Sequence, residues 1–325
     1  MSILVSIVLP FYNAASTLSV AVSSILAQTM SEWELLLVDD GSSDGSSEQA
    51  KAFAEKDARI RLISLPHGGI VSALNAGCDL AQGAFIARMD ADDYCVPTRL
   101  VKQVAYLQSH PEVGVVGCQV AFGGDRVQHA GYAAHVDWMN ELLTPDEHFQ
   151  NRFVDAPVAH PSVMWRKGMA EGYREGAFPE DFELWLRWMD EGVLFAKLPE
   201  VLMTWNDLPD RLSRQEDRYA PDAFYRIKCQ YLNKVLPDDR PIWLWGAGRV
   251  SRRRFSGLDR LEGYVDVDPK KFGQRLEGVP VQNYRELPEN AFVLSGVANR
   301  GVRNKIQAYL QSTGRVSVRD YYLCA

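Results

Sequence analysis

Three groups of acidic residues have the types and spacing that could carry chemistry. Asp39 and Asp40 directly follow one apolar run. A second apolar run precedes the cluster of Asp90, Asp92 and Asp93. Three carboxylates within four positions repel one another unless a cation or hydrogen-bond donors offset their charge. Their hard oxygen atoms suit Mn²⁺ or Mg²⁺ held together with a substrate phosphate. The alternative is a solvated turn or a helix cap, where aspartate is also favoured.

The third acidic group, Glu180 and Asp181, follows Pro179 and precedes an amphipathic stretch. Acidic residues in the first turn of a helix interact favourably with the helix dipole, so one interpretation is an ordinary helix N-terminus. A carboxylate at this place could also act as a general base. The residues alone leave both interpretations open.

The first half of the chain alternates β-branched apolar runs with stretches of helical periodicity, which together must position these groups. We expect strands at residues 3–9, 33–38, 60–65, 84–89 and 113–120. Repeated strand–helix–strand units predict a mostly parallel sheet covered by helices. Ligands bind at the carboxyl ends of the strands in such sheets, which is where the first two acidic groups lie.

After a linker-like segment at residues 236–241, the strand pattern begins again. An apolar run at 242–245 leads into the turn Gly246-Ala247-Gly248, and a later strand ends at Asp266. This predicts a first domain over residues 1–235 and a second, smaller α/β domain over residues 241–325. The glycine spacing resembles a dinucleotide fingerprint, but Ser251 replaces the third glycine, so we do not expect bound NAD.

Length and composition set wider limits. The 325 residues predict two domains, and a formal net charge of −7 argues against nucleic acid as a partner. No apolar run is long enough to span a bilayer, and the start lacks the basic region of a signal peptide. The five cysteines are scattered and form no CxxC pair, so we expect a cytoplasmic protein rather than a disulfide scaffold.

The acidic groups belong to a longer, ordered series of motifs. These motifs are VSIVLPFYN at residues 5–13, LVDDGSSD at 37–44, NAG at 75–77, MDADD at 89–93 and PEDFELW at 179–185. Across roughly residues 3–235, this order resembles the motif series of family-2 glycosyltransferases. The resemblance implies a GT-A (nucleotide-diphospho-sugar transferase) fold, a UDP-sugar donor and inverting transfer to a hydroxyl of a glycan or lipid-linked saccharide.

The same resemblance implies roles for individual residues on the nucleotide side. Those that would line the nucleotide site or contact the nucleotide are Pro10, Phe11, Tyr12, Asp39, Asp40, His67, Asn75, Asp90 and Ala91. Asp39, with Asp40, would hydrogen-bond the uracil ring. His67 departs from the asparagine that is frequent in the family, so it could either contact the nucleotide or face solvent.

The resemblance also implies the metal ligands and the base. Asp92 would ligate the metal that bridges the diphosphate, Asp90 would approach the ribose and be a second metal residue, and Asp93 would support the metal or contact the sugar. Asp181 would deprotonate the acceptor hydroxyl, with Glu180 beside it. Weaker candidates are Arg211, Ser213 and Arg214 as a diphosphate clamp, and His160 as an acceptor contact.

The C-terminal segment resembles a Rossmann-like domain appended to some family-2 transferases, among them a β-1,3-N-acetylglucosaminyltransferase-like protein. We expect it to be a structural module or one that forms a homo-oligomer. Two alternatives from other classes stay open. One is a catalytically silent nucleotide-binding module, and the other is an NAD-dependent sugar oxidoreductase acting through residues 246–266. A lipid-linked acceptor would bring the enzyme peripherally to the inner face of the membrane.

Overall fold

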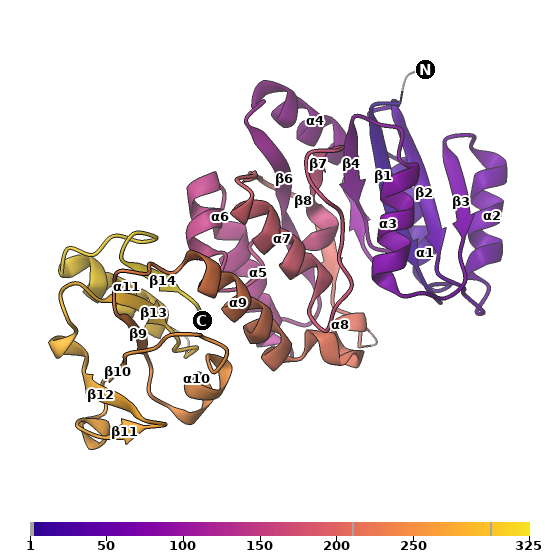
Figure 1. Ribbon diagram of the computed structural model, residues 1–325. Helices are drawn as coiled ribbons and strands as arrows, with labels where there is room; N and C mark the ends of the chain where they lie inside the picture. Colours follow the sequence, from indigo (N-terminus) through magenta and orange to yellow (C-terminus); the bar gives the residue numbers. More distant parts are fainter. Residues whose placement is uncertain (1–2, 210, 300) are drawn as a thin grey trace. The chain divides into compact units, whose positions relative to one another are not determined.

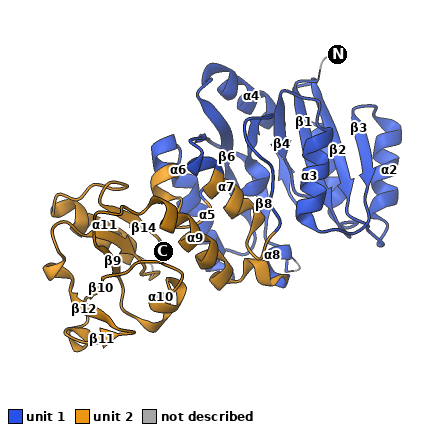
Figure 2. Ribbon diagram, viewed as in Figure 1, with its two compact units in different colours: residues 1–148, 157–175, 188–215 blue, residues 149–156, 176–187, 216–325 orange. Residues whose placement is uncertain are grey.

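The structure is a computed structural model that describes residues 3–209, 211–299 and 301–325 (Figure 1). The chain forms two compact units (Figure 2). Unit 1 contains residues 1–148, 157–175 and 188–215, and unit 2 contains residues 149–156, 176–187 and 216–325. The C-terminal sheet therefore packs with segments 149–156 and 176–187 and with the helix that ends at residue 235. The domain limits 1–235 and 241–325 remain a sequence-based prediction.

Among the described residues, unit 1 is built on an eight-stranded sheet with the order β3-β2-β1-β4-β7-β6-β8-β5. Its strands are β1 (Val5–Phe11), β2 (Trp33–Asp39), β3 (Ile60–Ser64), β4 (Phe85–Arg88), β5 (Tyr94–Cys95), β6 (Val113–Gly123), β7 (Met164–Arg166) and β8 (Leu194–Asn206). The five strands predicted up to residue 120 are present as β1, β2, β3, β4 and β6. Strands β1 to β4 pair in parallel, and β7 is antiparallel to both β4 and β6.

The helices of the first part of the chain lie between these strands, except for the last, which follows β8. They are α1 (Leu18–Leu26), α2 (Ser46–Lys56), α3 (Ile70–Leu80), α4 (Arg99–Ser109), α5 (Ala130–Glu141), α6 (Pro145–Asn151) and α8 (Leu212–Gln215). Helix α3 packs on β1 and β2. In the parallel register, Phe11 lies opposite Asp39 and Val8 lies opposite Arg88. The carboxyl ends of β1, β2 and β4 therefore meet at one edge of the sheet.

Two elements of unit 1 differ from the sequence-based expectation. The loss of apolar periodicity in the glycine- and histidine-rich residues 123–138 predicts a loop there, but α5 already begins at Ala130. Its buried residues Ala133, Val136 and Met139 are three positions apart, which is the spacing of one helix face. Strand β8 was not expected, since Pro199 interrupts its apolar run. The register with β6 shifts around this proline, which spares it from having to donate a ladder hydrogen bond.

The sheet of unit 2 has six strands among the described residues, in the order β11-β12-β10-β9-β13-β14. They are β9 (Ile242–Trp245), β10 (Gly263–Asp266), β11 (Arg275–Leu276), β12 (Val279–Asn283), β13 (Phe292–Ser295) and β14 (Tyr321–Leu323). All pairs are parallel except β11 with β12. Without the edge strand β11, this order corresponds to 3-2-1-4-5 of a Rossmann-like sheet, which agrees with the predicted Rossmann-like α/β fold.

The helices of unit 2 are α9 (Pro221–Val235), α10 (Arg249–Arg254) and α11 (Val302–Ser312). Helix α7 (Glu180–Asp190) also begins in unit 2, and its last residues, 188–190, belong to unit 1. The apolar core of unit 2 joins residues of α7 and α9 to residues of β9 and β13. The core is thus built from segments that are far apart in the sequence.

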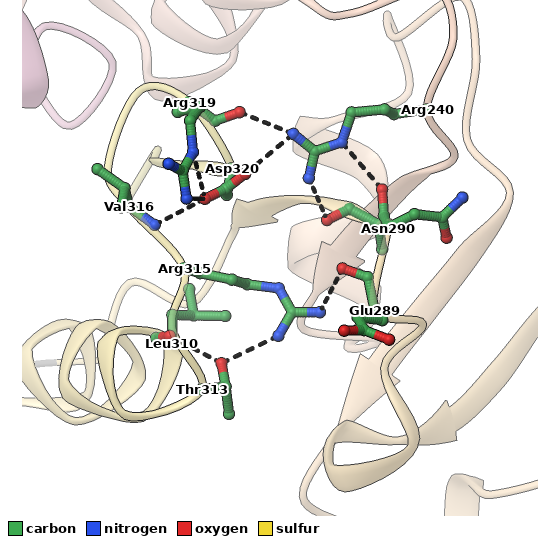
Figure 3. A network of polar contacts seen from close by, with 10 residues as sticks. Arg240, Glu289, Asn290, Leu310, Thr313, Arg315, Val316, Arg319 and Asp320 are labelled. Carbon is green, nitrogen blue, oxygen red and sulfur yellow. Dashed lines mark hydrogen bonds and ion pairs between the residues drawn. The ribbon is translucent and has the colours of Figure 1, made fainter.

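A polar network closes the amino-terminal edge of the second sheet (Figure 3). The Arg240 guanidinium donates hydrogen bonds to the carbonyl oxygens of Asn290 (2.9 Å) and Arg319 (2.8 Å) and to the Asp320 carboxylate (3.1 Å). Asp320 also accepts from the Val316 amide. The hydrogen bond from Arg319, with further help from these donors, lowers the pKa of Asp320 to about 2. These contacts fix the start of β13 and β14 with charge-assisted hydrogen bonds.

Candidate active site

The end of β1 presents an aromatic pair beside the end of β2. Pro10 and Phe11 are buried in β1, whereas Tyr12, just after the strand, is half exposed. The Tyr12 ring stacks on the His67 ring with 4.3 Å between centroids and 26° between planes. Two adjoining aromatic rings with exposed surface can receive the flat face of a nucleobase.

Asp39 and Asp40 are both buried, but they differ in how their oxygen atoms are used. Asp39 Oδ1 accepts a hydrogen bond from the Ser42 amide at 2.9 Å, and its Oδ2 has no hydrogen-bond partner among the residues that the structure describes. Asp40 accepts from the amides of Gly68 (2.8 Å) and Gly69 (2.9 Å) through its two oxygens. Asp39 therefore has an acceptor atom to offer a ligand, and Asp40 holds a loop.

The loop held by Asp40 carries His67. The His67 Nδ1 atom lies 2.9 Å from Asp40 Oδ2 and 3.0 Å from the Asp40 carbonyl oxygen. Gly41 has φ +80°, and a Cβ atom there would lie 2.9 Å from the His67 amide nitrogen. Only glycine fits this close approach without strain, so the turn after β2 and the His67 loop are fixed against each other.

Asn75 was predicted to lie in the nucleotide site, but its amide group is used within the protein. Its Nδ2 donates to the Tyr173 carbonyl at 2.9 Å, and its Oδ1 accepts from the Tyr173 amide at 3.0 Å. The Tyr173 hydroxyl is 2.7 Å from His160 Nε2. Burial holds the pKa of His160 well below its usual range, so this ring is neutral. Asn75 thus positions a segment that reaches His160.

The acidic cluster lies just beyond β4, with Ala91 buried between its first two carboxylates. Each of Asp90, Asp92 and Asp93 offers a carboxylate oxygen within 4.8 Å of the others. Asp90 forms an ion pair with Arg88, which is buried. Asp93 Oδ1 accepts from the Asn206 amide at 2.8 Å. Its Oδ2 is buried and has no hydrogen-bond partner within the described part of the chain.

The electrostatics of this cluster fit a cation. Burial, and then the charge of Asp90, raises the pKa of Asp92 to about 6. Burial and the charges of both neighbours raise the pKa of Asp93 well above its usual range. A divalent cation would reverse both effects and supply the missing partner of Asp93 Oδ2. The residues present therefore fit Mn²⁺ or Mg²⁺.

A basic segment after β8 faces the acidic cluster. The charge of Arg211 opposes the raised pKa of Asp92 and of Asp93, and its guanidinium lies over the Trp205 ring at 4.5 Å. The buried Asp207 carboxylate is 2.6 Å from Arg214 and 3.7 Å from Arg211. Asp207 was not among the predicted site residues. Its only signal in the sequence was its position four residues before Arg211, in a segment that matches the family's motifs poorly.

The remaining predicted pair, Glu180 and Asp181, opens helix α7 in unit 2. Glu180 is 4% exposed, and its Oε2 accepts a hydrogen bond from the Tyr219 hydroxyl at 2.6 Å. Burial and the Glu180 charge raise the pKa of Tyr219 above its usual range, so the phenol stays a donor. Asp181 is half-buried, and its Oδ1 accepts from the Phe182 amide at 2.7 Å.

The strand-end aspartate of unit 2 is engaged in a different way. Asp266 accepts hydrogen bonds from the Ala247 amide (2.9 Å), the Val267 amide (2.8 Å) and Lys271 Nζ (2.8 Å). Against the effect of burial, the hydrogen bonds from Lys271 and from the Asp268 and Ala247 amides lower the pKa of Asp266. In a dinucleotide site this carboxylate would bind a ribose hydroxyl, whereas here the protein already uses both of its oxygens.

The helices that the structure describes include none with both the length and the apolar character needed to cross a membrane.

These observations are explained by the family to which the chain belongs. Residues 6–171 match the model of Glycosyl transferase family 2, which is about half of the chain. The protein is therefore a member of this family and a glycosyltransferase, as the motif series predicted.

Curated relatives support the assignment. EpsJ of Bacillus subtilis, an uncharacterized glycosyltransferase, is 39% identical over 241 residues, which cover 71% of this chain and 69% of the relative. The O-antigen biosynthesis glycosyltransferase WbnJ of Escherichia coli is 27% identical, over 72% and 89% of the two chains. The amylovoran biosynthesis glycosyltransferase AmsE of Erwinia amylovora is 34% identical, over 61% and 74%.

Solved structures share the fold. S. aureus TarS 1–349 in complex with UDP-GlcNAc has a TM-score of 0.58 and 17% identity, over 73% of this chain and 68% of that one. The mannosyltransferase PcManGT from Pyrobaculum calidifontis, in complex with GDP-Man and Mn2+, has a TM-score of 0.51 and 19% identity, over 72% and 63%. The predicted GT-A fold is thus confirmed, and the second sheet is an additional domain.

Proposed function

We propose that the protein is a metal-dependent, inverting glycosyltransferase that moves a sugar from a UDP-sugar to a hydroxyl of a glycan or lipid-linked saccharide. The observation that carries the proposal is the acidic cluster after β4. In this cluster a buried Asp93 oxygen has no hydrogen-bond partner among the described residues, and burial raises the pKa of Asp92. Two structural neighbours support the proposal. TarS was solved in complex with UDP-GlcNAc, and PcManGT was solved in complex with GDP-Man and Mn2+.

On the nucleotide side, Tyr12 and His67 would receive one face of the uracil ring. The N3–H group of uracil is a donor, and Asp39 Oδ2 is an acceptor atom near the same strand ends. Asp40 would contribute indirectly, because its contacts with Gly68 and Gly69 fix the His67 loop. The base would thus be recognised by one carboxylate and one aromatic pair.

Asp92 and Asp93, with Asp90 beside Arg88, would hold the cation. When bound, the cation would offset the negative charge that grows on the diphosphate as it leaves. Arg211 would add a second positive charge on the same side, because it already acts on Asp92 and Asp93.

Asp181 would be the base. It would accept the proton of the acceptor hydroxyl while that oxygen bonds to the anomeric carbon and the bond from this carbon to UDP breaks. Attack on the face opposite the leaving group inverts the anomeric centre, as in glycosidases with one base and one displacement. A lipid-linked acceptor would also bring the protein to the surface of a membrane.

Calorimetry with UDP in the presence of Mn²⁺, and again after chelation, tests the donor and the metal together. We expect UDP binding to weaken roughly 10–100-fold without the metal. A hydrolysis screen over UDP-glucose, UDP-galactose, UDP-GlcNAc and GDP-mannose then identifies the donor. The same UDP affinity with and without Mn²⁺ would contradict metal dependence. Turnover of GDP-mannose alone would contradict the assignment of a uridine donor. Metal-dependent UDP binding without turnover of any donor would point to the silent nucleotide-binding module.

A further inference from the structure

The start of helix α7 belongs to the core of unit 2. Phe182 and Leu186 are almost fully buried, and they share one apolar cluster with Ile242 and Leu244 of β9. The same cluster includes residues of α9, β10, β12 and β13. The two acidic residues at the start of this helix therefore precede a stretch whose buried face is packed by the C-terminal sheet and by α9.

Two tyrosines that follow in the sequence bind the glutamates of this helix. The Tyr219 hydroxyl donates to Glu180 Oε2 at 2.6 Å, and the Tyr231 hydroxyl of α9 donates to Glu183 Oε1 at 2.8 Å. Glu183 also accepts from Arg187 at 3.0 Å, within the helix. The two glutamates are three residues apart, so consecutive turns of α7 are each fixed by a phenol.

A buried lysine ties further segments to the same core. Lys228 Nζ of α9 donates to the carbonyl oxygens of Val154 (3.0 Å) and Cys324 (2.9 Å), and it lies 5.9 Å from the centre of the Phe182 ring. Segment 149–156, α9 and the residue after β14 thus meet beside Phe182. The position of α7 is determined by several parts of unit 2 at once.

We propose that unit 2 has a role in catalysis, namely to position the Glu180–Asp181 pair, with Tyr219 and Tyr231 as positioning residues. The inference rests on the proposed function, in which Asp181 is the base. The hydrogen bond from the Tyr219 hydroxyl holds Glu180 Oε2, and Glu180 directly precedes Asp181 in the first turn of α7. The C-terminal sheet is then part of the transferase and not an independent binding module.

The test uses the full chain with Tyr219→Phe, Tyr231→Phe and, as a matched control, Tyr309→Phe. Tyr309 is a phenol of the same unit, and its ring packs on Trp245 and Tyr284 instead of α7. The measurements are hydrolysis of the best donor from the screen and calorimetric binding of UDP with Mn²⁺. We expect Tyr219→Phe to lower kcat about tenfold or more, because it removes a hydrogen bond to a charged group.

Tyr231→Phe should lower kcat only about threefold, since Glu183 keeps Arg187. Tyr309→Phe should stay within about twofold of the wild type, and all three variants should bind UDP as the wild type does. Glu180→Gln serves as a second test. If Tyr219 acts through Glu180, the double variant Glu180→Gln/Tyr219→Phe has the kcat of Glu180→Gln alone.

Three outcomes overturn the inference. The first is a Tyr219→Phe variant with wild-type kcat, the second is an equal loss of kcat in all three variants, and the third is additive losses in the double variant. A wild-type chain that binds UDP with Mn²⁺ but turns over no donor removes the proposed function, and the positioning role falls with it. Proper folding of each variant is checked by its UDP affinity and its near-ultraviolet circular dichroism.

Discussion

The sheet of unit 1 and the sheet of unit 2 both carry aspartates where parallel strands end, and the two sets of carboxylates have opposite surroundings. In unit 1, Asp92 and Asp93 face each other and Asp90, and Asp93 Oδ2 has no partner within the described residues. In unit 2, Asp266 accepts from backbone amides and from Lys271. The pKa of Asp92 is raised to about 6, whereas that of Asp266 is lowered.

The difference teaches which strand-end carboxylates can bind a ligand. A carboxylate whose oxygens already accept several hydrogen bonds stabilises the fold and gains little from a ligand. Carboxylates that are buried beside one another destabilise the fold until a cation arrives. We therefore expect the same position in two similar sheets to serve stability in one unit and, under the proposed function, binding in the other.

The largest expected effect separates the two aspartates by activity. Asp92→Asn removes a proposed metal ligand, so we expect kcat/KM for donor hydrolysis with Mn²⁺ to fall roughly 10²–10³-fold. Asp266→Asn is the matched control and should keep kcat/KM within about threefold of the wild type. Equal losses of kcat/KM in the two variants would show that the two aspartates do not differ in their contribution to activity.

The second prediction concerns the free energy of unfolding, for which we expect Asp266→Asn, rather than Asp92→Asn, to have the larger effect. Asp266→Asn loses the ion pair with Lys271, so we expect the free energy of unfolding to fall by about 1–3 kcal/mol. Denaturant unfolding followed by tryptophan fluorescence measures this change. Lys271→Met should show a similar loss, because it removes the other partner of the same bond. A neutral effect of both variants would mean that the backbone amides alone hold the Asp266 carboxylate.

The third prediction returns to the acidic cluster in metal-free protein. Asp93→Asn removes one of three repelling charges, so the metal-free protein should become more stable by about 1 kcal/mol. The same variant should lose the stabilisation that Mn²⁺ gives to the wild type. Differential scanning calorimetry with and without Mn²⁺ tests both statements. A loss of stability in the metal-free variant would show that the Asn206 contact outweighs the repulsion.

The smallest effect is a pH dependence of opposite sign in the two units. The folded pKa of Asp92, about 6, is above its unfolded value, so the folded state binds more protons between pH 4 and 6. Its contribution to stability in metal-free protein is present at low pH and is lost as the pH rises toward 6. The lowered pKa of Asp266 does the reverse, and its contribution is lost as the pH falls below about 4. Asp92→Asn and Asp266→Asn should each remove one slope from the unfolding free energy measured against pH.

Much of unit 1 follows from short stretches of sequence. Apolar runs predicted strands such as β1 and β2, because a buried parallel strand needs continuous apolar side chains. The acidic cluster was recognisable because its three carboxylates are neighbours in the chain. By contrast, β8 was missed because Pro199 breaks its run and its pairing with β6 is irregular.

The roles of adjacent residues were decided only by tertiary contacts. Asp39 and Asp40 are equivalent in the sequence. Their roles differ in the structure because the Gly68 and Gly69 amides donate hydrogen bonds to Asp40 and not to Asp39. Asn75 belongs to a motif that was predicted to line the nucleotide site, and its amide group binds the Tyr173 backbone. Such assignments depend on partners that are tens of residues away, and no local pattern contains them.

The sequence by itself determined the family, the two α/β sheets and the carboxylates available for a cation, because periodicity and motif order are local properties. Only the tertiary structure decided that the Asp266 carboxylate is occupied by Lys271 and that α7 is packed by the core of unit 2. Burial and hydrogen bonding between distant segments set which carboxylates keep unpaired oxygens. Those two quantities exist only once the chain has folded.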